Sequence, residues 1–181
     1  MNAPRTMGFH IPEDPELLKA LGTVSVCHAH LDYILKMLIK TLAGLSIEDA
    51  LDATARDGSA LLRDRARKLA KMKLGEGEPL LLLQAILERC GRATAQRNEL
   101  IHNVIISEID SDEAVMQTAD RKRKPLPAIS DLDSLASELI ALRGEINAAR
   151  LDGFLSEALK ARIRVRRMVT RRVEHLRLPF G

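Results

Sequence analysis

The hydrophobic and polar positions of the chain follow a helical period over most of its length. Apolar residues recur at alternating intervals of three and four, as one face of an α-helix requires. The clearest series runs through Leu17, Leu21, Val24, His28, Leu31, Leu35, Leu38 and Leu42. Asp14, Pro15 and Glu16 precede it and supply an N-cap, a first-turn proline and a first-turn acid. We predict a flexible N-terminal arm over residues 1–13, followed by a long helix that ends near Gly44.

Further segments carry helix signals of the same kind. Gly-containing turns at 57–59 and 75–79 separate several of them. The predicted helices run from Ser46 to about Arg56, from about Ala60 to Leu74, from Leu80 through His102, from Ser130 or Asp131 through Ala149, and from about Gly153 to Leu176. Because short turns join long apolar stripes, this order favours an antiparallel bundle.

The stretch between residues 104 and 127 departs from the helical period. Val104, Ile105 and Ile106 are β-branched, and residues 114–118 provide a second short segment that could pair with them. A basic run, 121–124, follows and is expected to form an exposed loop. The chain is therefore predicted to be an all-α helical bundle of about five to six helices with a small β-hairpin insertion, forming a single domain over residues 14–181.

The composition is typical of a helical globular protein. Hydrophobic residues make up 46% of the chain and aromatic residues only 2%, which leaves the core to Leu, Ala, Ile, Val and Met. The sequence begins without a signal peptide and has no apolar run long enough to cross a bilayer, so we expect a cytoplasmic protein with no membrane contact. Cys27 and Cys90 fall in helical patterns and are expected to be reduced, with no metal and no cofactor.

Cationic residues are unevenly distributed, although the formal net charge is only +3. They concentrate in the basic run and in the last predicted helix, where a polyanion could bind. The alternative is a solvated helix face that keeps the protein soluble. The candidates for RNA binding are Arg121, Lys122, Arg123, Lys124, Arg162, Arg166 and Arg167.

The string Arg97-Asn98-Glu99-Leu100-Ile101-His102 carries the most specific chemistry. Arg97 interrupts an apolar stripe and needs an anion, because an unpaired buried charge is unfavourable. Asn98 and His102 lie one turn apart on a second face, and His102 is about 140° around an ideal helix from Arg97. An imidazole can exchange a proton near neutral pH and a guanidinium can hold a phosphate, which together suit cleavage of RNA phosphodiesters.

This string resembles the motif of HEPN domains, which consists of arginine, a polar residue, three variable residues and histidine. The resemblance implies a helical bundle in which two motifs face each other across a homodimer and cleave RNA without metal. It implies Arg97, Asn98 and His102 as catalytic residues, and a toxin or phage-defence effector that an antitoxin protein could restrain. One subgroup has a tyrosine two residues after the histidine, where this chain has Val104.

Structural roles for the same residues stay open at this point. Arg97 could form a salt bridge with an acid such as Asp32 or Glu99, and His102 could interact with the dipole at the end of its helix. His28 lies on the core stripe and is expected to be a hydrogen-bonded interior histidine. The alternative to an endoribonuclease is accordingly a non-catalytic helical module that binds RNA or another protein.

Overall fold

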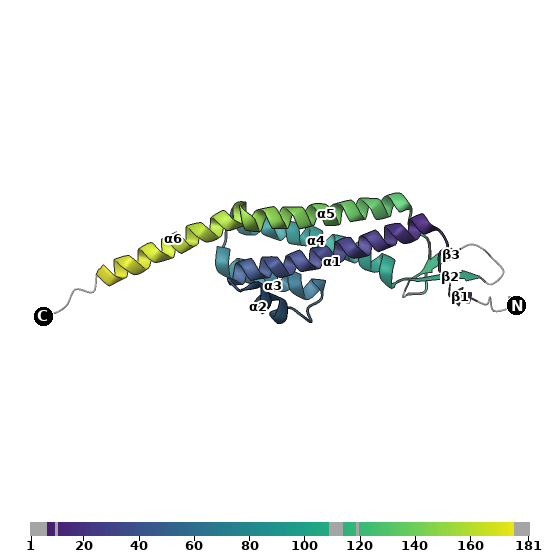
Figure 1. Ribbon diagram of the computed structural model, residues 1–181, viewed down its shortest axis with the longest axis horizontal. Helices are drawn as coiled ribbons and strands as arrows, with labels where there is room; N and C mark the ends of the chain where they lie inside the picture. The colour runs from purple at the N-terminus through teal and green to yellow at the C-terminus, as the bar shows by residue number, and fades with distance from the viewer. Residues whose placement is uncertain (1–6, 10, 109–113, 119, 176–181) are drawn as a thin grey trace. The chain divides into compact units, whose positions relative to one another are not determined.

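The computed structural model describes residues 7–9, 11–108, 114–118 and 120–175, without the side chains of residues 7, 8, 108 and 165–175. Within these ranges the helices are α1 (Pro15–Ala43), α2 (Ile47–Ala53), α3 (Ser59–Leu74), α4 (Glu78–His102), α5 (Ile129–Leu151) and α6 (Phe154–His175) (Figure 1). Short strands come between α4 and α5 and before α1. The predicted all-α bundle with a small β insertion is confirmed.

The chain divides into two compact units. Unit 1 comprises residues 1–32 and 89–143, and unit 2 comprises residues 33–88 and 144–181. Helices α1, α4 and α5 contribute residues to both units. The candidate motif belongs to unit 1, so the description of the site concerns that unit.

The predicted apolar stripes form the core. On α1 every stripe position except Leu21 is buried, including His28. On α5 the whole stripe is buried, and its members are Leu132, Leu135, Leu139, Leu142, Ile146 and Ala149. Burial of such Leu and Ile side chains contributes about 1.5–3 kcal/mol each relative to exposure. The alternating three and four spacing therefore identified the buried faces correctly.

Two of the predicted helix starts are confirmed by side-chain caps. The Asp14 carboxylate accepts a hydrogen bond from Glu16 N at 2.9 Å, and Ser46 Oγ accepts one from Asp49 N at 3.0 Å. The predicted cap of α5 is wrong, because the helix begins at Ile129 and the Ala128 carbonyl accepts its first bonds. The polar residues Ser130 and Asp131 instead lie in the first turn.

A four-stranded antiparallel sheet in unit 1 has the order β1-β2-β3-β4. Strands β2 (Val104–Glu108) and β3 (Ala114–Gln117) form the predicted hairpin. Two expectations are wrong: Met7–Phe9 of the supposed arm forms β1 and pairs with β2, and Arg123–Pro125 of the supposed basic loop forms β4 and pairs with β3. Both additions satisfy backbone groups that an isolated hairpin would leave open at its edges.

The two faces of this sheet differ in their surroundings. Residues opposite each other on paired strands share a face. One face carries Met116 and Lys124, and Lys124 Nζ is paired with the Glu99 carboxylate of α4. The other face points away from that contact, and its central residue Ile106 is buried. It carries Phe9, Val104, Ile106, Val115, Gln117, Arg123 and Pro125.

In unit 2, α3 ends at a glycine whose backbone conformation is specific. Gly75 has φ +64° and its N–H donates to the Lys71 carbonyl at 3.0 Å. Residues with a Cβ rarely adopt this conformation. A Cβ at this position would also meet the guanidinium of Arg162.

We expect Gly75→Ala to lower the free energy of unfolding by about 1 kcal/mol, because alanine is strained at positive φ. Urea denaturation followed by circular dichroism measures this effect. Gly58→Ala is the matched control, since Gly58 has no atom near its would-be Cβ and a negative φ. Equal stability of the two variants would contradict the assignment of strain to Gly75.

Candidate functional site

The motif occupies the last turns of α4, and the sequence explains why the helix stops there. After His102 and Asn103 the chain enters β2 with three β-branched residues, which favour extended backbone. Asn98 and His102 are both exposed, one turn apart on the same face of the helix. The predicted polar pair therefore lies on the surface of unit 1, at the end of a helix.

Arg97 lies beside this pair with its side chain half-buried. Its Nη1 donates a hydrogen bond to Asn98 Oδ1 at 3.1 Å. Its Nε is buried and has no hydrogen-bond partner among the described residues. A buried N–H donor without a partner is unfavourable by about 1–3 kcal/mol. The guanidinium thus has one buried N–H donor that no described residue accepts.

The two acids considered as salt-bridge partners of Arg97 face other groups. Glu99 is paired with Lys124, and Asp32 Oδ2 lies 3.8 Å from His28 Nδ1. In the described part of the chain, no ion pair joins Arg97 to an acid. The structural role suggested for Arg97, a salt bridge to one of these acids, is wrong.

A hydrogen bond joins Arg97 to Asn98, whereas none is found between either of them and His102 in the described part of the chain. Within the described residues, His102 makes no hydrogen bond or ion pair, and its imidazole is open to solvent. The predicted angular separation of Arg97 and His102 is consistent with this arrangement.

His28 is the interior histidine that the sequence predicted. It is buried, and its Nε2 lies 3.3 Å from Thr94 Oγ1. The Thr94 hydroxyl donates to the Cys90 carbonyl at 2.8 Å, so Nε2 is the donor in the contact between His28 and Thr94. This hydrogen bond joins α1 to α4 one turn before Asn98.

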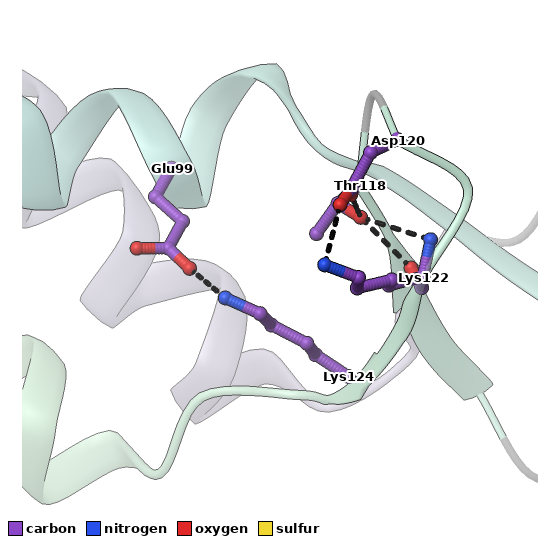
Figure 2. Close-up of polar contacts among 5 residues, drawn as sticks. All are labelled: Glu99, Thr118, Asp120, Lys122 and Lys124. Carbon is purple, nitrogen blue, oxygen red and sulfur yellow. Dashed lines mark hydrogen bonds and ion pairs between the residues drawn. The ribbon is translucent and has the colours of Figure 1, made fainter.

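A short basic turn connects β3 to β4 at the end of the sheet where β2 begins (Figure 2). Thr118 organises it: Thr118 N donates to the Lys122 carbonyl at 2.9 Å, and Thr118 Oγ1 accepts from Lys122 N at 3.1 Å. Arg121 has φ +64°, a left-handed conformation that is unfavourable by about 1–2 kcal/mol for a residue with a Cβ. The turn therefore holds an arginine where glycine would be relaxed.

The strand register brings this basic turn to the motif's end of the sheet. Val104, two residues after His102, pairs with Gln117, and Gln117 pairs with Arg123. Adjacent strands are about 4.8 Å apart, so Val104 and Arg123 are about 10 Å apart in the direction of the strand spacing. Four of the predicted RNA-binding residues, 121–124, thus lie near the end of α4.

Ion pairs partly balance the positive charge of the turn. Lys122 Nζ lies 2.8 Å from Asp120 Oδ2, and the hydrogen bonds from Lys122 and Thr118 lower the pKa of Asp120 below its usual value of 3.8. The Glu99 carboxylate accepts a hydrogen bond from Lys124. This bond and the negative charge of Glu99 raise the pKa of Lys124 above the usual lysine value of 10.5. Arg121 is exposed, and no ion pair joins it to another described residue.

We expect an NMR titration of the Asp120 carboxyl carbon to give a midpoint below pH 3.8, and Lys122→Ala to move it upward. A lowered pKa in the folded state means that the carboxylate stabilises the turn above pH 3.8 and that this contribution is lost as the pH falls through the folded-state value. Lys19→Ala, which removes an exposed lysine of α1, is the control. A wild-type midpoint at or above 3.8 would contradict this description of the turn.

The remaining predicted RNA-binding residues belong to unit 2. Arg162 is exposed on α6, and its guanidinium lies against the backbone of Gly75. The helical backbone of α6 continues through Arg166 and Arg167, whose side chains lie outside the described part of the chain. The prediction that these residues contact RNA stays a prediction.

Unit 1 also contains an open pocket that the sequence did not indicate. Its volume is about 480 Å³, and it lies among α4, β3 and α5. It is lined by Gln96, Glu99, Leu100, Met116, Pro127, Asp131, Ser134, Leu135 and Glu138. Three carboxylates belong to this lining, and so do Glu99 and Leu100 of the motif, whereas Arg97, Asn98 and His102 do not line it.

Across the described ranges, His, Cys, Asp and Glu side chains do not gather in groups of three or more that could hold a metal ion. None of the described helices combines the length and apolar character needed to span a bilayer. Comparisons with protein-family models, with curated proteins and with solved structures find no match to this chain.

Proposed function

We propose that this chain is a metal-independent endoribonuclease of the HEPN type. In this proposal it acts in the cytoplasm as a homodimer, as a toxin or phage-defence effector that an antitoxin protein restrains. One observation carries the proposal: half-buried Arg97 makes no ion pair with any described residue and donates a hydrogen bond to Asn98, one turn from the exposed His102. This combination leaves a cation and an imidazole available to a substrate.

The residues have distinct roles in the proposed reaction. The 2′-oxygen attacks the adjacent phosphorus while a base removes its proton, and the 5′-oxygen leaves with a proton from an acid. Arg97 would stabilise the negative charge that develops on the phosphoryl oxygens. Asn98 would hold Arg97 in position through the hydrogen bond to Nη1. His102 supplies one proton-transfer group, so the second would come from His102 of a second copy.

Purified full-length protein incubated with mixed RNA in EDTA tests the proposal. We expect cleavage that leaves a 2′,3′-cyclic phosphate on one product and a 5′-hydroxyl on the other, because the 2′-oxygen is the nucleophile. An oligonucleotide with a single 2′-deoxy residue at the cleaved position should stay intact there. No cleavage of any RNA by a folded protein would contradict the proposal.

The non-catalytic alternative predicts a different result in the same experiment. A helical RNA-binding or protein-interaction module would bind RNA without shortening it, whatever the 2′ substituent. The basic turn near the motif is compatible with such a module. Binding without cleavage would therefore favour the alternative over the endoribonuclease.

A further inference from the structure

Unit 2 contains an open pocket among three of its helices, and no residue of the motif belongs to this unit. The pocket lies where α1 ends, beside the last turn of α3 and the first half of α6, and its volume is about 640 Å³. Pockets that bind small molecules usually measure about 300–1,000 Å³ and are lined mainly by apolar side chains with a few polar groups. The size of this pocket is therefore that of a small-molecule site.

Most of the pocket wall is apolar. Leu42 is buried, and Ala43 and Leu159 are half-buried. Met72 of α3 and Ile163 of α6 are more exposed, at 68% and 54%. Two exposed apolar side chains from different helices thus border one cavity, and an apolar ligand in it would shield both from water.

The charged part of the wall is positive. Lys73 and Arg162 line the pocket, and both are exposed. Neither makes an ion pair with another described residue, and no acid belongs to the described lining. The neighbouring Lys71 is different, because it is paired with Glu76. Two uncompensated cations beside an apolar cavity favour a ligand that carries a negative charge.

The helix ends at the pocket supply an opposing charge, which is smaller. The C-terminus of an α-helix carries about half a negative elementary charge, so the ends of α1 and α3 together amount to about one. Lys73 and Arg162 contribute two full positive charges, and Lys40 adds another in the last turn of α1. The charge around the pocket is therefore positive on balance.

We propose that this pocket binds a single-chain amphiphile with an anionic head, such as a fatty acid, with its chain against the apolar wall and its carboxylate near Lys73 and Arg162. A nucleotide is a poorer ligand, because the described lining holds no aromatic side chain on which a base could stack. A second copy is also a poorer occupant, since a twofold contact through this face would bring the same cations together. The inference gives Arg162 a ligand other than the RNA predicted from the sequence.

Isothermal titration calorimetry with sodium decanoate, kept below its micelle concentration, measures this binding. We expect saturable binding to one site, and binding that tightens by up to about fourfold for each methylene added between octanoate and decanoate. Decyltrimethylammonium has a chain of the same length with a cationic head and should not bind. Equal affinity for the anionic and the cationic amphiphile would overturn the inference.

Met72→Asp places a negative charge in the pocket wall and removes an apolar contact. We expect it to weaken decanoate binding about tenfold or more. Leu61→Asp is the matched control, because Leu61 is an apolar residue of the same helix that is 46% exposed and lies outside the pocket lining. This variant should bind like wild type. Circular dichroism should show the wild-type fold in both variants, since both replaced side chains are exposed, and unchanged affinity in Met72→Asp would reject the pocket.

Lys73→Gln tests the charge separately from the apolar wall. We expect decanoate to bind about fivefold more weakly, as the loss of an exposed ion pair implies. Lys68→Gln removes another exposed lysine of α3 that does not line the pocket, so it should bind like wild type. Arg162→Gln and its control Arg164→Gln form the same pair on α6. Full affinity in both Lys73→Gln and Arg162→Gln would contradict an anionic ligand.

Two further outcomes would assign this face to another occupant and overturn the inference. Binding to vesicles of anionic phospholipid without binding of monomeric decanoate would indicate a membrane surface. A wild type that binds no decanoate, and whose sedimentation changes in Met72→Asp, would indicate a second copy. None of these measurements involves RNA, so the result for the pocket is independent of the result for the proposed endoribonuclease.

Discussion

Replacing His102 by alanine is expected to reduce the rate of RNA cleavage by a factor of about 10²–10⁴, the usual contribution of a general acid or base. The imidazole is exposed and makes no hydrogen bond or ion pair within the described residues, so its loss should leave the fold unchanged. Cleavage of a fluorogenic RNA in EDTA measures the rate, and thermal denaturation checks the fold.

The control for this variant is His30→Ala, which removes an exposed histidine of α1 in the same unit. His30 Nδ1 lies 3.4 Å from Arg143 Nη1, so this variant loses one surface contact but no motif residue. We expect His30→Ala to cleave RNA like wild type. Equal rates for wild type and His102→Ala would exclude His102 as an acid or base.

The homodimer in the proposal can be examined with the same variant. If two copies of His102 share the proton transfers, each mixed dimer of wild type and His102→Ala has one imidazole where two are needed. Adding excess His102→Ala to wild type should then lower the activity more than dilution does. Activity that is strictly proportional to the amount of wild-type protein would contradict a shared site.

Arg97→Met is expected to change stability and activity in opposite directions. The buried Nε has no partner among the described residues, and methionine would fill a similar volume without an unsatisfied donor. We expect the free energy of unfolding to rise by about 1 kcal/mol or more, and cleavage to fall by a factor of at least about 10², as loss of a charge-stabilising group does. Urea denaturation and the RNA assay measure the two effects.

The matched control is Arg92→Met, which removes an exposed arginine from the same helix. Surface substitutions of this kind usually change stability by less than about 0.5 kcal/mol. A stabilised, inactive Arg97→Met would indicate a residue kept for function at the expense of stability. A destabilised variant would instead indicate a structural role for Arg97 and favour the non-catalytic module.

Local patterns predicted most of the helical framework. The stripe of α1, the stripe of α5 and the caps at Asp14 and Ser46 all depend on neighbours within four residues, and the structure confirms them. The hairpin of β2 and β3 was equally predictable, because its strands are adjacent in the sequence. Local signals suffice where the partner of a residue is close along the chain.

Pairing over long sequence distances was not predictable in the same way. Strand β1 has three residues and no alternating pattern, and its partner strand follows about a hundred residues later at Phe9 and Ile106. Residues 7–9 therefore carry no local signal that predicts a strand. Strand β4 was hidden for a related reason, since its lysine and proline are typical of loops as well as of sheet edges.

At the candidate site too, the local helical geometry was predictable, whereas contacts with residues distant in the sequence were not. Asn98 and His102 share a face of α4, as helical geometry predicts, and both side chains are exposed. The partners proposed for Arg97 are wrong, because Glu99 pairs with Lys124 of β4 and Asp32 faces His28. Whether an acid is available to an arginine depends on every other cation near it in space, which a single helix pattern does not contain.

The sequence of β4 also limits how the sheet can grow. Strand β4 forms an edge, and an open edge is a template on which a strand of another molecule can add. Proline has no backbone N–H to offer such a strand, and the charges of Arg123 and Lys124 would repel a like sequence. The sheet is thereby protected on this side against intermolecular strand addition, so concentrated protein should resist amyloid-like aggregation through β4.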